Sequence, residues 1–122
     1  PVGLITDGIL HSNNTRDTLT DRRAGIKTMA MGLGHKASAI LYGFEVIFPY
    51  VWIGVLSIMG LMPITTIVIF LTLAVAIGCA KTMMHSLEGG SGVIADLDVR
   101  TANLQLMFSA LLTVAFIVAK FI

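Results

Sequence analysis

Charged residues are scarce in this sequence. Only 12% of its 122 residues are Asp, Glu, Lys or Arg, whereas 56% are hydrophobic. A soluble domain carries about 25% charged residues, so this composition excludes an ordinary soluble globule and indicates lipid as the solvent. The net charge of +1 by itself implies nothing about nucleic acid, and no basic-aromatic surface pattern suggests a nucleic-acid partner.

Cysteine is nearly absent as well. Cys79 is the one cysteine, which excludes an intrachain disulfide, and its apolar surroundings predict a buried, inert thiol. Because no His-x-x-His or Cys-x-x-Cys pattern occurs, a transition-metal site is not expected. The sequence opens without Met and without a signal-peptide pattern, so we expect a segment of a longer protein.

Long apolar runs make up most of the remainder. A helix needs roughly 20 apolar residues to cross a bilayer. Residues 1–10 are too short for this and resemble the tail of a helix. The sequence therefore predicts an all-α integral membrane protein, with a partial N-terminal helix and about three transmembrane helices, at residues 37–60, 61–80 and 103–122.

The basic residues predict the topology. The link GLMP at residues 60–63 is expected to be a tight hairpin in which Pro63 opens the next helix. Residues 82–102, which include GGSG, are expected to form a flexible loop. All the basic residues except Lys120 then fall on the side opposite the hairpin. The positive-inside rule predicts that this side is cytoplasmic, or its stromal or matrix equivalent.

The most polar stretch is HSNNTRDTLTDRRAGIKT at residues 11–28. If residues 13–24 are helical, Asn13, Asp17 and Asp21 are four apart and share one face. Like charges at this spacing repel each other, which favours a cation between them. Hard oxygen ligands suit Mg²⁺, which typically takes one or two carboxylates and completes its shell with water and substrate phosphates.

Basic residues of the same stretch favour a phosphate ligand. Arg16, Arg23 and Lys27 lie at i, i+7 and i+11, so a continuous helix would present them on a neighbouring face to phosphate oxygens. The alternative is that the two aspartates pair with Arg16, Arg22 and Arg23 in a solvated loop at the membrane surface. Composition alone leaves both interpretations open.

The order of the residues is more specific. The string N-N-x-R-D-x-x-x-D-x-x-A-G at residues 13–25 resembles the second aspartate-rich motif of UbiA-type membrane prenyltransferases, in particular their naphthoate branch, which makes menaquinone and phylloquinone. The resemblance spans nearly the whole chain, and residues 8–34 are its specific part. Further matching segments are GILHSNNTRD at 8–17, LG at 33–34, ILY at 40–42, PY at 49–50 and RTAxL at 100–104.

This resemblance implies a helical bundle in which two aspartate-rich motifs face each other across a central cavity. In such a site Mg²⁺ and basic residues hold an isoprenyl diphosphate, whose allylic group passes to a 1,4-dihydroxy-2-naphthoate-like or naphthoquinone acceptor. Asp17 and Asp21 match the catalytic, metal-binding positions, together with Asn13. The diphosphate contacts are then assigned to Asn13, Arg16 and Arg22, with Lys27 added from its spacing.

The sequence also departs from the family. It lacks the first aspartate-rich motif and supplies about half of the family's helices, so residues 1–122 are interpreted as the C-terminal half of a UbiA-like domain, with the motif at 11–34. Alone, it is not expected to be active, and it needs the N-terminal half or a partner membrane subunit. The alternative is a non-catalytic small subunit of a larger quinone-using complex, such as a photosystem.

Glu45 is unusual because it lies inside the first full span, where a carboxylate is costly. It can hydrogen-bond a neighbouring helix, face a cavity and its acceptor, or ligate a pigment metal. His11, just before the motif, is expected either to contact substrate or to be a hydrogen-bonded interface residue. A small ion-conducting protein is a further alternative, supported by Glu45 alone.

Overall fold

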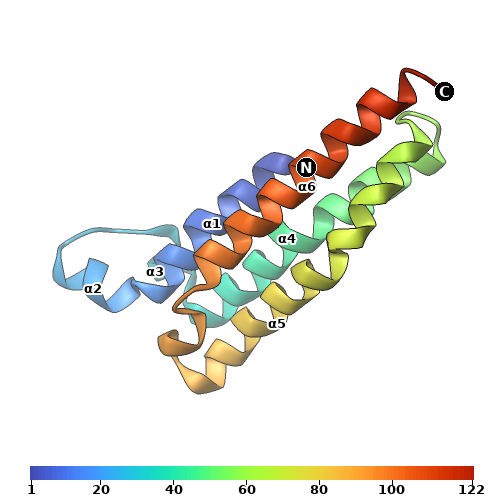
Figure 1. The fold of residues 1–122 in the computed structure, drawn as a ribbon. Helices are drawn as coiled ribbons and strands as arrows, with labels where there is room; N and C mark the ends of the chain where they lie inside the picture. Colours follow the sequence, from blue (N-terminus) through green and yellow to red (C-terminus); the bar gives the residue numbers. More distant parts are fainter.

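A computed structural model describes residues 1–122 and contains helices but no strands (Figure 1). This confirms the predicted all-α class. The elements in chain order are α1 (Val2–Arg16), α2 (Thr18–Arg23), α3 (Met29–Leu33), α4 (His35–Ile58), the 3₁₀ helix η1 (Ile64–Thr72), α5 (Leu73–Gly89), the 3₁₀ turn η2 (Ser91–Ile94) and α6 (Leu97–Ala119).

The long helices form one bundle. α4 packs against α1, η1 and α5, while α6 packs against α1 and η1. The short helices α2 and α3 lie at one end, beside the α5–α6 link, and the α4–η1 turn lies at the other end (Figure 1). Three segments are long and apolar enough to cross a membrane, at His35–Ile58, Ile64–Gly89 and Ser91–Ala119. The prediction of an integral membrane protein with three spans is therefore confirmed.

The expected loop at residues 82–102 is wrong. α5 continues to Gly89 and α6 begins at Leu97, so the real link contains only residues 90–96. The helical hydrogen bonds continue beyond the apolar part of these two spans. Hydropathy detects only the apolar part, so it placed the end of α5 too early and the start of α6 too late. α5 ends where Gly90 adopts φ 78° and ψ −175°, a conformation that glycine tolerates and other residues avoid.

The expected hairpin at residues 60–63 is present, and Pro63 precedes η1 directly. The first nine residues of the second span are a 3₁₀ helix, whereas the sequence predicted an ordinary transmembrane helix. Its ITTIVI run is rich in β-branched side chains, which are crowded in an α-helix. The hydroxyls of Thr66 and Thr72 each donate to a carbonyl three residues back, at 2.8 Å, which fits the tighter winding.

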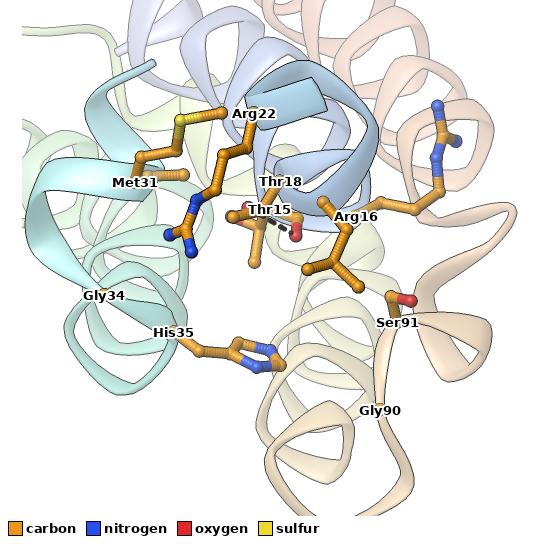
Figure 2. A pocket seen from close by; sticks show the side chains of 11 residues that line it. Thr15, Arg16, Thr18, Arg22, Met31, Gly34, His35, Gly90 and Ser91 are labelled. Carbon is orange, nitrogen blue, oxygen red and sulfur yellow. Dashed lines mark hydrogen bonds between the residues drawn. The ribbon is translucent and has the colours of Figure 1, made fainter. Parts of the chain in front are cut away.

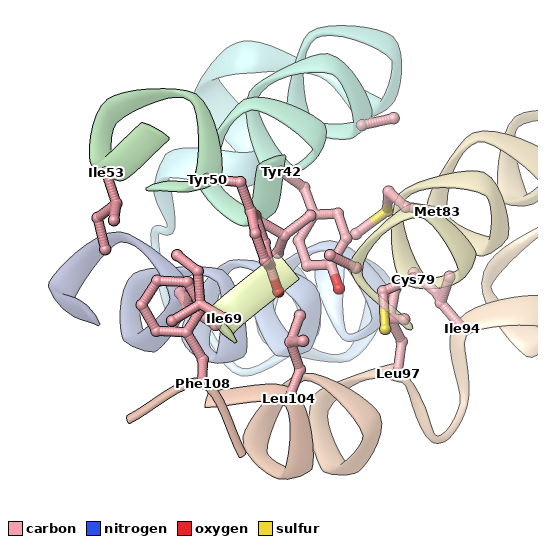
Figure 3. Packing of buried hydrophobic residues seen from close by; sticks show 14 residues of the cluster. Tyr42, Tyr50, Ile53, Ile69, Cys79, Met83, Ile94, Leu97, Leu104 and Phe108 are labelled. Atoms are coloured by element: carbon pink, nitrogen blue, oxygen red, sulfur yellow. The ribbon is translucent and has the colours of Figure 1, made fainter. Parts of the chain in front are cut away.

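Hydroxyl pairs link α4 to its neighbours within the apolar core. Tyr42 Oη lies 2.6 Å from Thr101 Oγ1 of α6, and Tyr50 Oη lies 2.7 Å from Thr72 Oγ1 of η1. The Tyr50 ring also meets Phe108 edge-on, with centroids 5.2 Å apart. Both tyrosines lie in the middle of the buried cluster shown in Figure 3. Cys79 is also buried there and free, as predicted.

Candidate functional site

The three oxygen-bearing residues of the motif occupy successive helical turns. Asp17 N donates to Asn13 O at 2.9 Å, and Asp21 N donates to Asp17 O at 2.9 Å. The helix is nevertheless interrupted, since α1 ends at Arg16 and Asp17 has φ −92° and ψ 8° before α2 begins. The predicted four-residue spacing is therefore present in the backbone, with a break at its central residue.

Arg16 holds the break in place. Its Nε and Nη2 donate to the two Asp17 carboxylate oxygens at 2.8 and 2.9 Å. Its Nη1 donates to the Ala95 carbonyl at 3.0 Å and to Asp98 Oδ1 at 3.1 Å, which ties the motif to the start of α6. The Asp17–Arg16 pair is the one that the solvated-loop alternative anticipated.

These contacts change the proton affinities of both groups. Hydrogen bonding from the Arg16 guanidinium lowers the pKa of the Asp17 carboxyl from its ordinary value of 3.8. The Asp17 carboxylate, with a further contribution from Asp98, raises the pKa of Arg16. Asp17 therefore stays ionised to a lower pH than an ordinary aspartate.

The side-chain oxygens of the other two motif residues, Asn13 and Asp21, are not paired with an arginine. Asn13 Oδ1 is buried without a hydrogen-bond partner, and the Asp21 side chain forms no ion pair. Buried acceptors in this condition are uncommon. No group of three His, Cys, Asp or Glu side chains gathers anywhere in the chain. An amide oxygen and two carboxylates are ligand types that Mg²⁺ accepts, and that ion commonly takes few protein ligands.

A cavity of about 280 Å³ opens beside the motif (Figure 2). The Arg22 guanidinium and the His35 ring extend toward it, whereas the Arg16 side chain leads away toward α6 (Figure 2). No carboxylate lines it, so its charged groups favour an anion. The lining residues are Thr15, Arg16, Thr18, Leu19, Arg22, Ala30, Met31, Gly34, His35, Gly90 and Ser91.

The predicted basic face does not form. α2 ends at Arg23, and Gly25, with φ 73°, turns the chain before Lys27. Lys27 therefore lies in an exposed link, and neither it nor Arg23 lines the cavity. Arg22 reaches the cavity, and Arg16 lies at its edge with its charge occupied by Asp17 and Asp98.

Glu45 and His11 contact each other. His11 Nδ1 lies 3.0 and 3.1 Å from the two Glu45 carboxylate oxygens, and both side chains are buried. Of the alternatives for Glu45, a hydrogen bond to a neighbouring helix is thus observed. The same contact makes His11 an interface histidine between α1 and α4.

Known proteins resemble part of this chain. The UbiA prenyltransferase domain-containing protein 1 homolog of Drosophila melanogaster is 54% identical over 50 residues, or 41% of this chain and 14% of its own length. The proteins named UbiA prenyltransferase domain-containing protein 1 of Xenopus tropicalis and Homo sapiens are each 47% identical over 57 residues, or 47% of this chain. These matches cover 16% and 17% of the relatives' own lengths.

The matched 50 to 57 residues of this chain are thus similar to part of the UbiA prenyltransferase domain-containing proteins. No family model matches the chain. No solved structure matches it. Because only a small share of each UbiA relative is matched, the acceptor and the activity of the whole protein are matters for proposal.

Two residues of the site were missed by sequence reasoning. Asp98 is 82 residues from Arg16 in the chain, and spacing gives no sign that they meet. His35 was not assigned to the site, but it lines the cavity and lies 2.7 Å from Ser86 Oγ. Both residues lie at the start of a helix at the polar end of the bundle, and this shared position is the signal that could have linked them to the site.

Proposed function

We propose that this chain forms part of a membrane prenyltransferase, which moves an isoprenyl group from its diphosphate to a 1,4-dihydroxy-2-naphthoate-like or naphthoquinone acceptor. The observation that carries the proposal is the set of Asn13, Asp17 and Asp21 on successive turns beside a cavity that presents Arg22. The similarity to UbiA prenyltransferase domain-containing proteins supports the same reaction class.

The oxygen donors have separate roles in this proposal. Asn13 Oδ1 and the Asp21 carboxylate are free to ligate Mg²⁺, while Asp17 contributes an oxygen that Arg16 holds in a fixed orientation. Mg²⁺ supplies charge neutralisation of the diphosphate, which makes it a better leaving group. Asp17, which its arginine holds in the ionised form, would supply a negative charge to the cation.

The diphosphate is recognised at the cavity. Arg22 forms no ion pair within the chain, so its donors remain available for phosphate oxygens. The hydroxyls that line the same cavity supply further polar groups, and the adjoining spans offer an apolar path for the isoprenyl chain. Arg16 acts through Asp17 and not by direct contact. Lys27 lies in the exposed link after α2 and does not line the cavity, so its charge acts only at a distance.

The remaining half of the site comes from the N-terminal half of the protein or from a partner membrane subunit. The polar end of the bundle faces the cytoplasm, the stroma or the matrix, where water-soluble diphosphates are available. This placement brings the diphosphate from the aqueous side and the isoprenyl chain from the lipid.

The test uses the protein expressed from its complete coding sequence in membranes, supplied with Mg²⁺, an isoprenyl diphosphate and 1,4-dihydroxy-2-naphthoate. The Asp17→Ala/Asp21→Ala double variant should lose at least about 100-fold in turnover, since two ligands of the reacting complex are removed. Glu88→Ala, which removes an exposed carboxylate at the same end, should keep wild-type turnover. Unchanged turnover in the double variant would refute this assignment of the site.

The alternative is a non-catalytic subunit of a quinone-using membrane complex. It predicts that the wild-type protein shows no Mg²⁺-dependent transfer and purifies with a stable set of other membrane subunits. Transfer that depends on Asp17 and Asp21 would rule it out.

A further inference from the structure

A buried imidazole–carboxylate pair joins α1 to α4 inside the bundle. His11 is 3% exposed and Glu45 is 2% exposed. Glu45 lies ten residues after the start of α4, which corresponds to about 15 Å along the helix axis, roughly the middle of a bilayer core. Ionisable groups at this depth are rare and commonly mark functional sites.

One nitrogen of this pair has no partner. His11 Nδ1 is satisfied by both Glu45 oxygens, but His11 Nε2 is buried without any hydrogen bond. Apart from Asn13 Oδ1, no other buried side-chain nitrogen or oxygen is left in this condition. Leaving a buried polar atom unpaired is costly. His11 Nε2 is therefore open to a hydrogen bond with a polar group from outside this chain.

A small cavity adjoins His11. Its volume is about 90 Å³, and it is lined by Asp7, Leu10, His11, Asn14, Met29 and Ala30. Leu10 and Met29 are 59% and 53% exposed, so apolar side chains border a cavity whose other groups are polar. This volume is below that of an ordinary ligand pocket. It has room for a polar group of a ligand, whose apolar part would then contact Leu10 and Met29.

We propose that His11 Nε2 binds a hydroxyl group of the aromatic acceptor and that Glu45 is a positioning residue for the imidazole. The identity of the acceptor rests on the proposed function. A hydroxyl both donates and accepts, so it satisfies Nε2 whether or not that nitrogen carries a proton, whereas a ring carbonyl only accepts. Glu45 fixes the orientation of the ring through Nδ1, as carboxylates do for functional histidines.

The experiment compares the binding of two probes by the protein expressed from its complete coding sequence and reconstituted in lipid. One is 1,4-dihydroxy-2-naphthoate, kept reduced, and the other is 2-naphthoate, which lacks both hydroxyls. The wild type should bind the first about tenfold more tightly or better. His11→Phe should bring the ratio of the two dissociation constants close to one. Glu45→Leu should reduce it in part.

Two further variants separate recognition from folding. His11→Phe leaves Glu45 buried without its partner, so the His11→Phe/Glu45→Leu double variant is measured as well and should show the same loss of discrimination. His11→Gln keeps a polar group and should restore part of the ratio. Tyr50→Phe removes another buried interhelical hydrogen bond and serves as the matched control, with the wild-type ratio retained.

The outcomes distinguish this proposal from the proposed function. A ratio that stays at the wild-type value in both His11→Phe and the double variant would overturn the assignment of His11, even if prenyl transfer occurs. Equal binding of both probes by the wild type would overturn it too. Loss of discrimination in those variants without any prenyl transfer by the wild type would instead support the His11 site and reject the transferase.

Discussion

Arg16 connects two parts of the chain that sequence spacing keeps far apart. It pairs with Asp17 at the end of α1 and with Asp98 in the first turn of α6. Both placements favour the helices, because a cation suits a helix C-terminus and an anion suits an N-terminus. The arginine thus stabilises the motif mainly by fixing where α1 stops relative to α6.

The lowered pKa of Asp17 predicts a pH-dependent contribution to stability. Its folded-state pKa lies below the ordinary 3.8, so the stabilisation is present above that value and is lost as the pH falls through the lowered pKa. Both side chains are partly exposed, so Asp17→Asn should cost only about 0.5 kcal/mol at neutral pH. Thermal unfolding in detergent from about pH 6 to about pH 3 should show the two proteins converging.

Asp21→Asn is the control for this measurement, since Asp21 forms no ion pair. A stability difference between wild type and Asp17→Asn that persists undiminished at the acidic end would contradict the role given to Arg16.

At the same scale, sequence reasoning recovered neighbours and missed distant partners. The Arg16–Asp17 pair follows from adjacent opposite charges and was anticipated as one alternative. The spacing of Asn13, Asp17 and Asp21 follows from helix geometry. The His11–Glu45 and Arg16–Asp98 contacts span 34 and 82 residues, and they depend on how helices cross, which no local pattern specifies.

At the scale of elements, α1 approaches α4 and α6 closely at a glycine. A Cβ placed on Gly8 would lie 3.4 Å from Val46 Cγ1 and 3.6 Å from both Thr101 Cγ2 and Tyr42 Cε2. These are ordinary contact distances, so the space holds one methyl group and no more. The small residue at this crossing is what allows His11, one turn further along, to reach Glu45.

Gly8→Leu is therefore expected to destabilise the bundle by about 1–3 kcal/mol, because its extra atoms overpack the crossing. Gly8→Ala should be neutral or stabilising, since alanine is the better helix former and its Cβ fits. Gly3→Leu is the control in the same helix, where nothing lies within 4 Å of the added Cβ. Unfolding midpoints in detergent measure all three, and equal effects of leucine at positions 3 and 8 would refute the close crossing.

The spans were predictable because hydropathy reports which residues lie in lipid. Their ends were not, because a helix stops where its hydrogen bonding stops. Arg100 was assigned to the loop at residues 82–102, but it lies within α6 and donates to Thr82 Oγ1 of α5 at 3.0 Å. Polar residues in the first and last turns of a membrane helix are predicted as loop residues when composition alone is considered.

Across the whole molecule, the two ends of the bundle differ in character. One end carries α2, α3, the α5–α6 link and the cavity, with the basic residues of the motif (Figure 1). The other end carries the short uncharged turn between α4 and η1 and the C-terminus of α6 with Lys120 (Figure 1). This asymmetry supports the orientation proposed from the positive-inside rule, with the cavity on the cytoplasmic, stromal or matrix side.

That orientation is open to a direct labelling test, because Cys79, the single cysteine of these 122 residues, is buried and should not react. Arg23→Cys places a thiol at the cavity end, and Leu61→Cys places one at the opposite turn, where the native side chain is 67% exposed. In sealed vesicles with the cytoplasmic side outward, a membrane-impermeant maleimide should label position 23 and leave position 61 unlabelled until detergent is added. The unsubstituted protein should stay unlabelled in both conditions. Labelling of position 61 alone in intact vesicles would invert the topology and move the diphosphate cavity to the other side of the membrane.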